Sequence, residues 1–83
     1  MMNISQLGYD LENETIVFCG VQIQCGDEME VMIPSPVDGQ WGWVPVRLVW
    51  ENQPAQRWRL LSEDPVMDAV LCTCDPVGMF ARK

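Results

Sequence analysis

The chain has 83 residues, of which 48% are hydrophobic and 20% are charged, and its net charge is -7. This length suits one small domain, and this composition is typical of a folded chain rather than of a disordered one. Histidine-based catalysis is excluded, because the sequence contains no histidine.

The middle of the chain is predicted to form short β-strands. Between residues 15 and 61, side chains alternate in polarity and no amphipathic helical stripe occurs. The first two strands are expected at 15–18 and 21–25. The alternation changes phase at Cys19-Gly20, which predicts a bulge or tight turn there.

The next strand follows a turn at Gly26-Asp27 and covers residues 28–33. Its inner face is predicted to hold Met29, Val31 and Ile33. Residues 34–40 contain two prolines and an Asp-Gly pair, which are typical of a surface loop.

Two more strands are predicted after this loop, and they complete an antiparallel meander. In the strand at 43–50, the residues predicted to face the core are Val44, Val46, Leu48 and Trp50. In the last strand, at 56–61, Trp58 and Leu60 share one face. Arg57 and Arg59 share the other face.

The end of the chain is predicted to leave the β pattern. Ser62 is expected to cap a short helix that runs to about Leu71, with acids and a proline in its first turn. The basic end, Arg82-Lys83, either folds back on the acidic half of the chain or frays. We therefore predict one domain over residues 1–83, with a β core at about 9–61 and a helix and tail at 62–83.

The fold class predicted from these elements is mainly β. Four or five short strands that close on themselves bury a core without long exposed edges, so we expect a small SH3-like or OB-like antiparallel barrel. A flat three-stranded sheet with one helix is the alternative. The high apolar content of so short a chain also makes a homo-oligomer credible.

The acidic residues are concentrated in the first half of the chain. Residues 1–46 contain seven acids and no Lys or Arg, whereas the remainder contains five of each sign. Because phosphate backbones bind Lys and Arg, direct nucleic-acid binding is not expected.

No segment has the pattern of a signal peptide, and the longest uncharged stretch is shorter than the roughly 20 residues of a membrane span. A cytoplasmic protein without membrane contact is expected.

The chain contains four cysteines: Cys19, Cys25, Cys72 and Cys74. Reduced thiols are expected, with the first two as small core residues and the last two in the tail. One tetrahedral zinc site is the alternative, but the cysteine spacing does not match the Cys-x-x-Cys pairs of a zinc knuckle.

Four short motifs lie between Tyr9 and Leu61: Cys25-Gly26-Asp27, Glu30-Val31, Gly42-Trp43-Val44-Pro45-Val46-Arg47 and Trp58-Arg59-Leu60. They resemble the Cys-Gly-Asp, Trp-Val-Pro-x-Arg and Trp-x-Leu pattern of an uncharacterised family of short bacterial and phage-borne proteins, known only as a domain of unknown function. The loop before the tryptophan is longer here, and the tail has extra residues. The resemblance implies a small β module, often carried on mobile elements, and implies no activity or catalytic residue.

The predicted function is that of a small, acidic, non-enzymatic module that binds a basic or proline-containing segment of another protein. Tryptophan faces attract prolines and cations, and a neighbouring acidic loop favours Arg or Lys. The predicted binding residues are Trp41, Trp43, Pro45, Asp27, Glu28 and Glu30. In the opposing interpretation, barrel closure buries Trp41 and Trp43 as core.

Two other functions are considered. The charge asymmetry is compatible with a phage or mobile-element inhibitor that imitates nucleic acid and occupies the basic channel of a host protein. An enzyme is not expected, because the carboxylates at Asp27, Glu28 and Glu30 are predicted to be solvated and the sequence has no glycine-rich phosphate loop. No catalytic residue, metal ion or cofactor is predicted.

Overall fold

The computed structural model describes residues 3–53 and 56–83 and confirms a mainly β fold. In chain order its elements are β1 (Ile4–Gln6), β2 (Gly8–Asp10), β3 (Thr15–Phe18), β4 (Val21–Gln22), β5 (Glu28–Pro34), β6 (Trp41–Glu51), β7 (Arg57–Leu61), α1 (Pro65–Leu71) and β8 (Phe80–Arg82). None of the helices in these two segments is long and apolar enough to cross a membrane.

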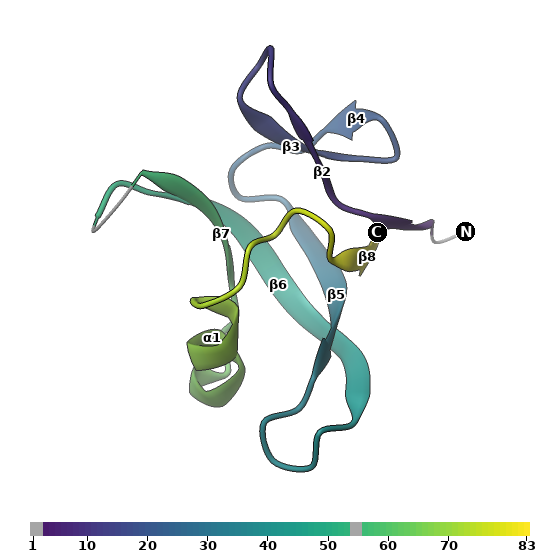
Figure 1. The fold of residues 1–83 in the computed structure, drawn as a ribbon, viewed down its shortest axis with the longest axis vertical. Helices are drawn as coiled ribbons and strands as arrows, with labels where there is room; N and C mark the ends of the chain where they lie inside the picture. Colours follow the sequence, from purple (N-terminus) through teal and green to yellow (C-terminus); the bar gives the residue numbers. More distant parts are fainter. Residues whose placement is uncertain (1–2, 54–55) are drawn as a thin grey trace.

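The strands form two antiparallel sheets, which lie one above the other in Figure 1. The larger sheet has the order β1-β8-β5-β6-β7, and the smaller one has the order β2-β3-β4. The two sheets do not make a closed barrel, so the expected SH3-like or OB-like barrel is not confirmed. The alternative of one three-stranded sheet is wrong, because the larger sheet alone has five strands.

The centre of the larger sheet is the predicted meander of β5, β6 and β7. Its inner face agrees with the sequence pattern, because Met29, Val31 and Ile33 of β5 are buried. On β6, Val46 and Leu48 are buried and Val44 packs partly against the core.

Trp50 does not take the predicted place in the core, because its side chain is 42% exposed. It lies one residue from the end of β6 and pairs there with Trp58 of β7. The alternation therefore assigns Trp50 to the correct face of the strand. At this end of the β6–β7 ladder, however, the core covers that face only partly.

The turn predicted at Cys19-Gly20 is confirmed by positive φ angles of 53° and 76°. The strand after it is shorter than predicted, since β4 ends at Gln22. Cys19 and Cys25 lie in turns and are exposed, so the prediction that they are core residues is wrong.

The predicted helix is present as α1, but its cap is Asp64 rather than Ser62. The Asp64 carboxylate accepts a 3.0 Å hydrogen bond from the N–H of Val66. The Ser62 hydroxyl accepts instead from the N–H of Asp64, at 3.1 Å. The helix is joined to β7 by an ion pair of 2.7 Å between Arg59 and Asp68.

The C-terminal tail folds back as β8 and does not fray. It inserts between β1 and β5, which brings the two chain ends together (Figure 1). The backbone N–H of Asn3 donates to the carbonyl of Lys83 at 3.3 Å. The predicted β core at 9–61 is therefore too short at both ends.

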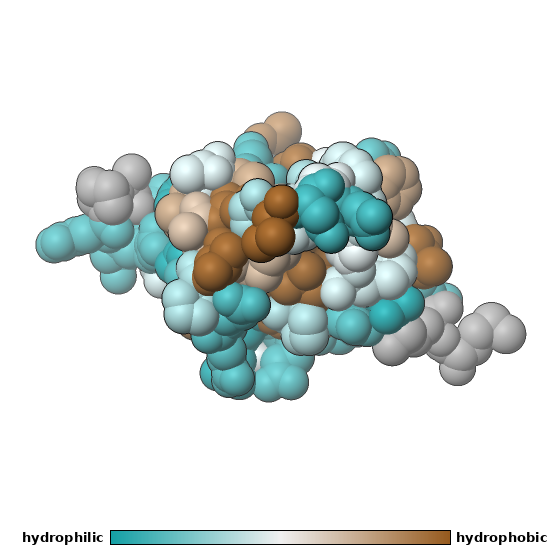
Figure 2. Space-filling model, turned by 90° about the horizontal axis from the view of Figure 1, so that it is seen from below, coloured by the Kyte–Doolittle hydropathy of each residue, from teal (hydrophilic) through white to brown (hydrophobic). Residues whose placement is uncertain are grey.

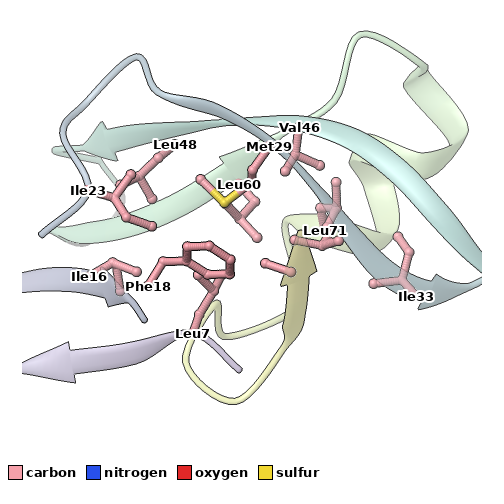
Figure 3. Packing of buried hydrophobic residues seen from close by; sticks show 12 residues of the cluster. Leu7, Ile16, Phe18, Ile23, Met29, Ile33, Val46, Leu48, Leu60 and Leu71 are labelled. Atoms are coloured by element: carbon pink, nitrogen blue, oxygen red, sulfur yellow. The ribbon is translucent and has the colours of Figure 1, made fainter. Parts of the chain in front are cut away.

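The core lies between the two sheets, as Figure 3 shows. The smaller sheet and the segments beside it contribute Leu7, Ile16, Phe18 and Ile23, and the larger sheet contributes residues that include Met29, Val46, Leu48 and Leu60. Leu71 of α1 and Ala81 of β8 are also fully enclosed. Burial of a side chain the size of Leu71 contributes about 1.5 to 3 kcal/mol. The late segments of the chain are therefore part of the same core.

Candidate functional site

The outer face of the larger sheet presents the predicted tryptophan strip. Trp41, Trp43 and Pro45 alternate along β6 with residues that face the core. Trp41 is 68% exposed, Pro45 is exposed and Trp43 is half-buried. Neither ring belongs to the core cluster, so the interpretation that barrel closure buries both is wrong.

Cross-strand register explains why the acidic residues of β5 lie beside this strip. Glu30 is paired with Pro45, and Glu28 with Arg47. Paired residues in an antiparallel ladder point to the same face, so these glutamates share the outer face with Trp43. The register of β5 and β6 thus brings together side chains that are far apart in the sequence, such as Glu28 and Arg47, which are 19 positions apart.

A groove of about 810 Å³ lies here, and we call it the β6 groove. Four of the six predicted binding residues line it: Glu28, Glu30, Trp43 and Pro45. The other lining residues are Met29, Val44, Val46, Arg47, Leu61, Ser62, Glu63, Asp64, Met67, Arg82 and Lys83. The remaining two predicted residues, Trp41 and Asp27, lie outside its lining.

Figure 2 views the end of the molecule that carries α1 and the loop between β5 and β6, and hydrophobic side chains are exposed there among hydrophilic ones. Val37 of the loop, Trp41 at the start of β6 and Val66 of α1 are the large apolar residues that these segments expose. This end of the molecule therefore exposes apolar surface.

The predicted acidic flank is not a free cluster of negative charge. Each of its three acids forms an ion pair: Asp27 with Lys83 at 3.3 Å, Glu28 with Arg47 at 2.8 Å and Glu30 with Arg82 at 2.9 Å. Two of these bases belong to the end of the chain, which the sequence allowed to fold back. These three carboxylates are therefore already paired within the chain, and their role in binding a partner's cation stays a prediction.

Arg82 also contacts the strip itself. Its guanidinium carbon lies 4.5 Å from the centre of the Trp43 ring. This is a cation–π contact, and the same guanidinium is bound to Glu30. The chain thus places one of its own arginines on Trp43, and that ring is less exposed than Trp41.

The pKa values of the paired groups are shifted in favour of their charged forms. The N–H of Gln24 and, after it, the Lys83 ammonium lower the pKa of Asp27, although partial burial opposes them. The hydrogen bond and the charge of Glu28 raise the pKa of Arg47. Asp27 and Arg47 therefore keep their charges at neutral pH.

The structure uses every Lys and Arg of the chain in an ion pair. Besides the three pairs above, Arg57 and Arg59 bind Glu51, and Arg59 also binds Asp68. Within the described residues, seven acids form no ion pair: Asp10, Glu12, Glu14, Asp38, Glu63, Asp64 and Asp75. The number of these acids equals the net negative charge of the sequence, but only the fold shows which acids they are.

The four cysteines are free thiols and do not gather into a metal site. In residues 3–53 and 56–83, no three Cys, Asp or Glu side chains are arranged to hold a metal ion. The thiols of Cys72 and Cys74 donate hydrogen bonds to carbonyls of α1, at 3.1 and 3.2 Å.

No family model matches the chain, and comparison with curated proteins and with solved structures finds no similar protein. The resemblance to the bacterial and phage family stays a prediction.

Proposed function

We propose that this chain is a small non-enzymatic module that binds an extended, proline-containing and basic segment of a partner protein in the β6 groove. The free cysteines favour a reducing compartment, so we place the module in the cytoplasm.

The contact of Arg82 with Trp43 is the observation that carries the proposal. In it, a basic residue on an extended strand stacks on an indole ring and pairs with a neighbouring carboxylate. This is the chemistry that we assign to the partner segment, and the module's own end already uses it. The exposed surfaces of Trp41 and Pro45 continue the same strip beyond Arg82.

The shape and the charge of the groove favour such a segment. Trp43, Pro45 and Leu61 provide apolar surface, and an extended proline-rich chain docks against aromatic surface with little loss of conformational entropy. Glu63 and Asp64 line the same groove and form no ion pair in the described residues. They are the carboxylates available to a basic side chain of the segment.

Calorimetric titration with the peptide acetyl-Pro-Pro-Arg-Pro-Pro-amide tests this function. Trp43→Ala is expected to weaken binding about 30-fold, because loss of an aromatic anchor at a hot spot costs about 2 kcal/mol or more. Leu11→Ala is the matched control, since Leu11 is 84% exposed and lies outside the groove lining. It should bind as tightly as the wild type.

Trp43 also packs against Arg82, so the melting temperature of each variant is measured in parallel. If Trp43→Ala does not fold, Leu61→Ala replaces it, because Leu61 lines the groove and is 36% exposed. Unchanged affinity in a folded groove variant, or no binding by the wild type, would refute the proposal.

A second candidate is the inhibitor that imitates nucleic acid. The seven acids without an ion pair favour it, and three of them, Asp10, Glu12 and Glu14, lie in or beside the turn between β2 and β3. Such a protein competes with DNA for a basic channel, and its association slows as salt rises. Competition with duplex DNA for purified nucleic-acid enzymes of the native host, with and without Glu12→Gln and Glu14→Gln, tests it. Lack of competition at low salt would remove this candidate.

A further inference from the structure

A second concave surface, of about 500 Å³, lies away from the β6 groove and shares no residue with its lining. Three aromatic residues line it: Tyr9 of β2, Trp50 of β6 and Trp58 of β7. The segment after α1 closes one side with Asp75 and Pro76. We call this surface the aromatic pocket.

The two tryptophans are held in a defined arrangement. Their ring centres are 5.1 Å apart with an interplanar angle of 70°, an edge-to-face pair. The indole N–H of Trp58 donates to the carbonyl of Glu14 at 2.9 Å, and that of Trp50 donates to Asn52 at 3.0 Å. Because both N–H groups already have acceptors, the rings offer a ligand their π surfaces rather than hydrogen-bond donors.

These rings are accessible, unlike those of core aromatics. Tyr9 and Trp50 are each 42% exposed, and Trp58 is half-buried. Large apolar surface that remains open in a concave site is a common property of binding pockets, and the volume here suits one side chain or small ligand. Packing in the core therefore does not account for all three aromatic residues.

The charges around the pocket favour a cation. Asp75 is the acidic residue that lines it. Its carboxylate forms no ion pair within residues 3–53 and 56–83. The lining base, Arg57, is bound to Glu51 and to the carbonyl of Cys72, so its charge is already compensated.

We propose that the aromatic pocket binds an arginine or lysine side chain of a partner protein. The negative face of an indole or phenol ring attracts a cation, and the uncompensated carboxylate of Asp75 strengthens that attraction. An anionic or neutral side chain gains neither contribution. This site does not depend on the β6 groove, and the failure of one leaves the other intact.

NMR titration with acetyl-Gly-Gly-Arg-Gly-Gly-amide tests the pocket, and the matched probe replaces arginine with its neutral analogue citrulline. The indole N–H signals of Trp50 and Trp58 are expected to shift with the arginine peptide. The citrulline peptide should bind roughly 5- to 30-fold more weakly, since it keeps the shape of arginine but lacks the cation–π attraction.

Two variants locate the site. Trp50→Ala should abolish the shift at Trp58, whereas Asp75→Asn keeps the hydrogen bond that Asp75 accepts from the N–H of Val77 and removes only the charge. We expect Asp75→Asn to weaken binding about two- to fivefold, as is typical of one exposed charge. Val37→Ala is the control, because Val37 is 87% exposed and lies in the loop between β5 and β6. It should not change the affinity.

Three results would overturn the proposal. The first is equal binding of the arginine and citrulline peptides, which would show that the cation is not recognised. The second is a shift of the Trp43 signal alone, which would assign the peptide to the β6 groove. The third is no shift of Trp50 or Trp58 at millimolar peptide. The proposed function is judged separately, by the proline-containing peptide and the Trp43 signal.

Discussion

The contact between Arg82 and Trp43 allows a quantitative test of how the C-terminal strand is held on the sheet. Arg82→Ala removes an ion pair to Glu30 whose two side chains are 29% and 28% exposed. It also removes the stacking on Trp43 at 4.5 Å. Partly exposed ion pairs contribute up to about 1 kcal/mol, and cation–π contacts contribute about 0.5 to 1 kcal/mol. We expect a loss of about 1.5 kcal/mol in the free energy of unfolding.

In a domain of this size, 1 kcal/mol corresponds to about 4 to 8 °C in melting temperature, so Arg82→Ala should melt about 6 to 12 °C lower. Urea unfolding monitored by tryptophan fluorescence measures the free energy directly. Arg82→Lys is the matched variant, because it retains the charge beside Glu30 and loses the planar stacking group. It should lie between the wild type and Arg82→Ala.

A double-mutant cycle of Arg82→Ala and Trp43→Ala separates the stacking from the ion pair. The expected coupling free energy is about 0.5 to 1 kcal/mol. A coupling below about 0.3 kcal/mol, which is within the usual error of additivity, would show that the two groups are neighbours without an energetic contact. In that case, Arg82 would not be a model for the cation of a partner segment.

Three further predictions concern the stability of the fold. Leu48→Ala should lower the free energy of unfolding by about 2 to 5 kcal/mol, since Leu48 is fully buried and a cavity would remain. A loss below about 1 kcal/mol, measured by urea unfolding, would contradict the burial of Leu48 in the core. Gly20→Ala should lower the free energy of unfolding by about 1 kcal/mol, because φ is +76° at this position. The strain is confined to the backbone, since no atom lies within 4 Å of the added Cβ, and an unchanged melting temperature would indicate a different turn. Burial opposes the ionisation of Asp68, but the N–H of Ser62 and the Arg59 guanidinium outweigh it, and the pKa of Asp68 lies below its ordinary value of 3.8. The stability that this carboxylate provides is therefore complete above that value and is lost as pH falls through the lower folded-state pKa. The difference in the free energy of unfolding between the wild type and Asp68→Asn should narrow between about pH 5 and pH 2. A difference that does not depend on pH in urea unfolding would refute this reasoning.

Local patterns in the sequence determined the central strands and the direction of their side chains. A period of two in residues 28–33 places alternate side chains on opposite faces whatever the strand pairs with, so the inner face of β5 was predictable. The turn at Gly20 and the short helix were predictable for the same reason, since backbone angles and capping depend on neighbouring residues. The alternation of side chains along β6 places Trp41 on the face opposite the core, but Trp41 is exposed only because the rest of the described chain leaves that face open there.

Tertiary structure decided the rest, because those features depend on residues that are far apart in the chain. β1 and β8 have three residues each, too few for a periodic signal, and each becomes a strand only through pairings such as Ile4 with Arg82. The same register sets Arg82 beside Glu30, 52 positions away, and forms an ion pair there that the spacing of the sequence does not specify. Strand register and sheet packing therefore decide which carboxylates keep an uncompensated charge and which aromatic rings border them. Composition and spacing in the sequence do not specify this.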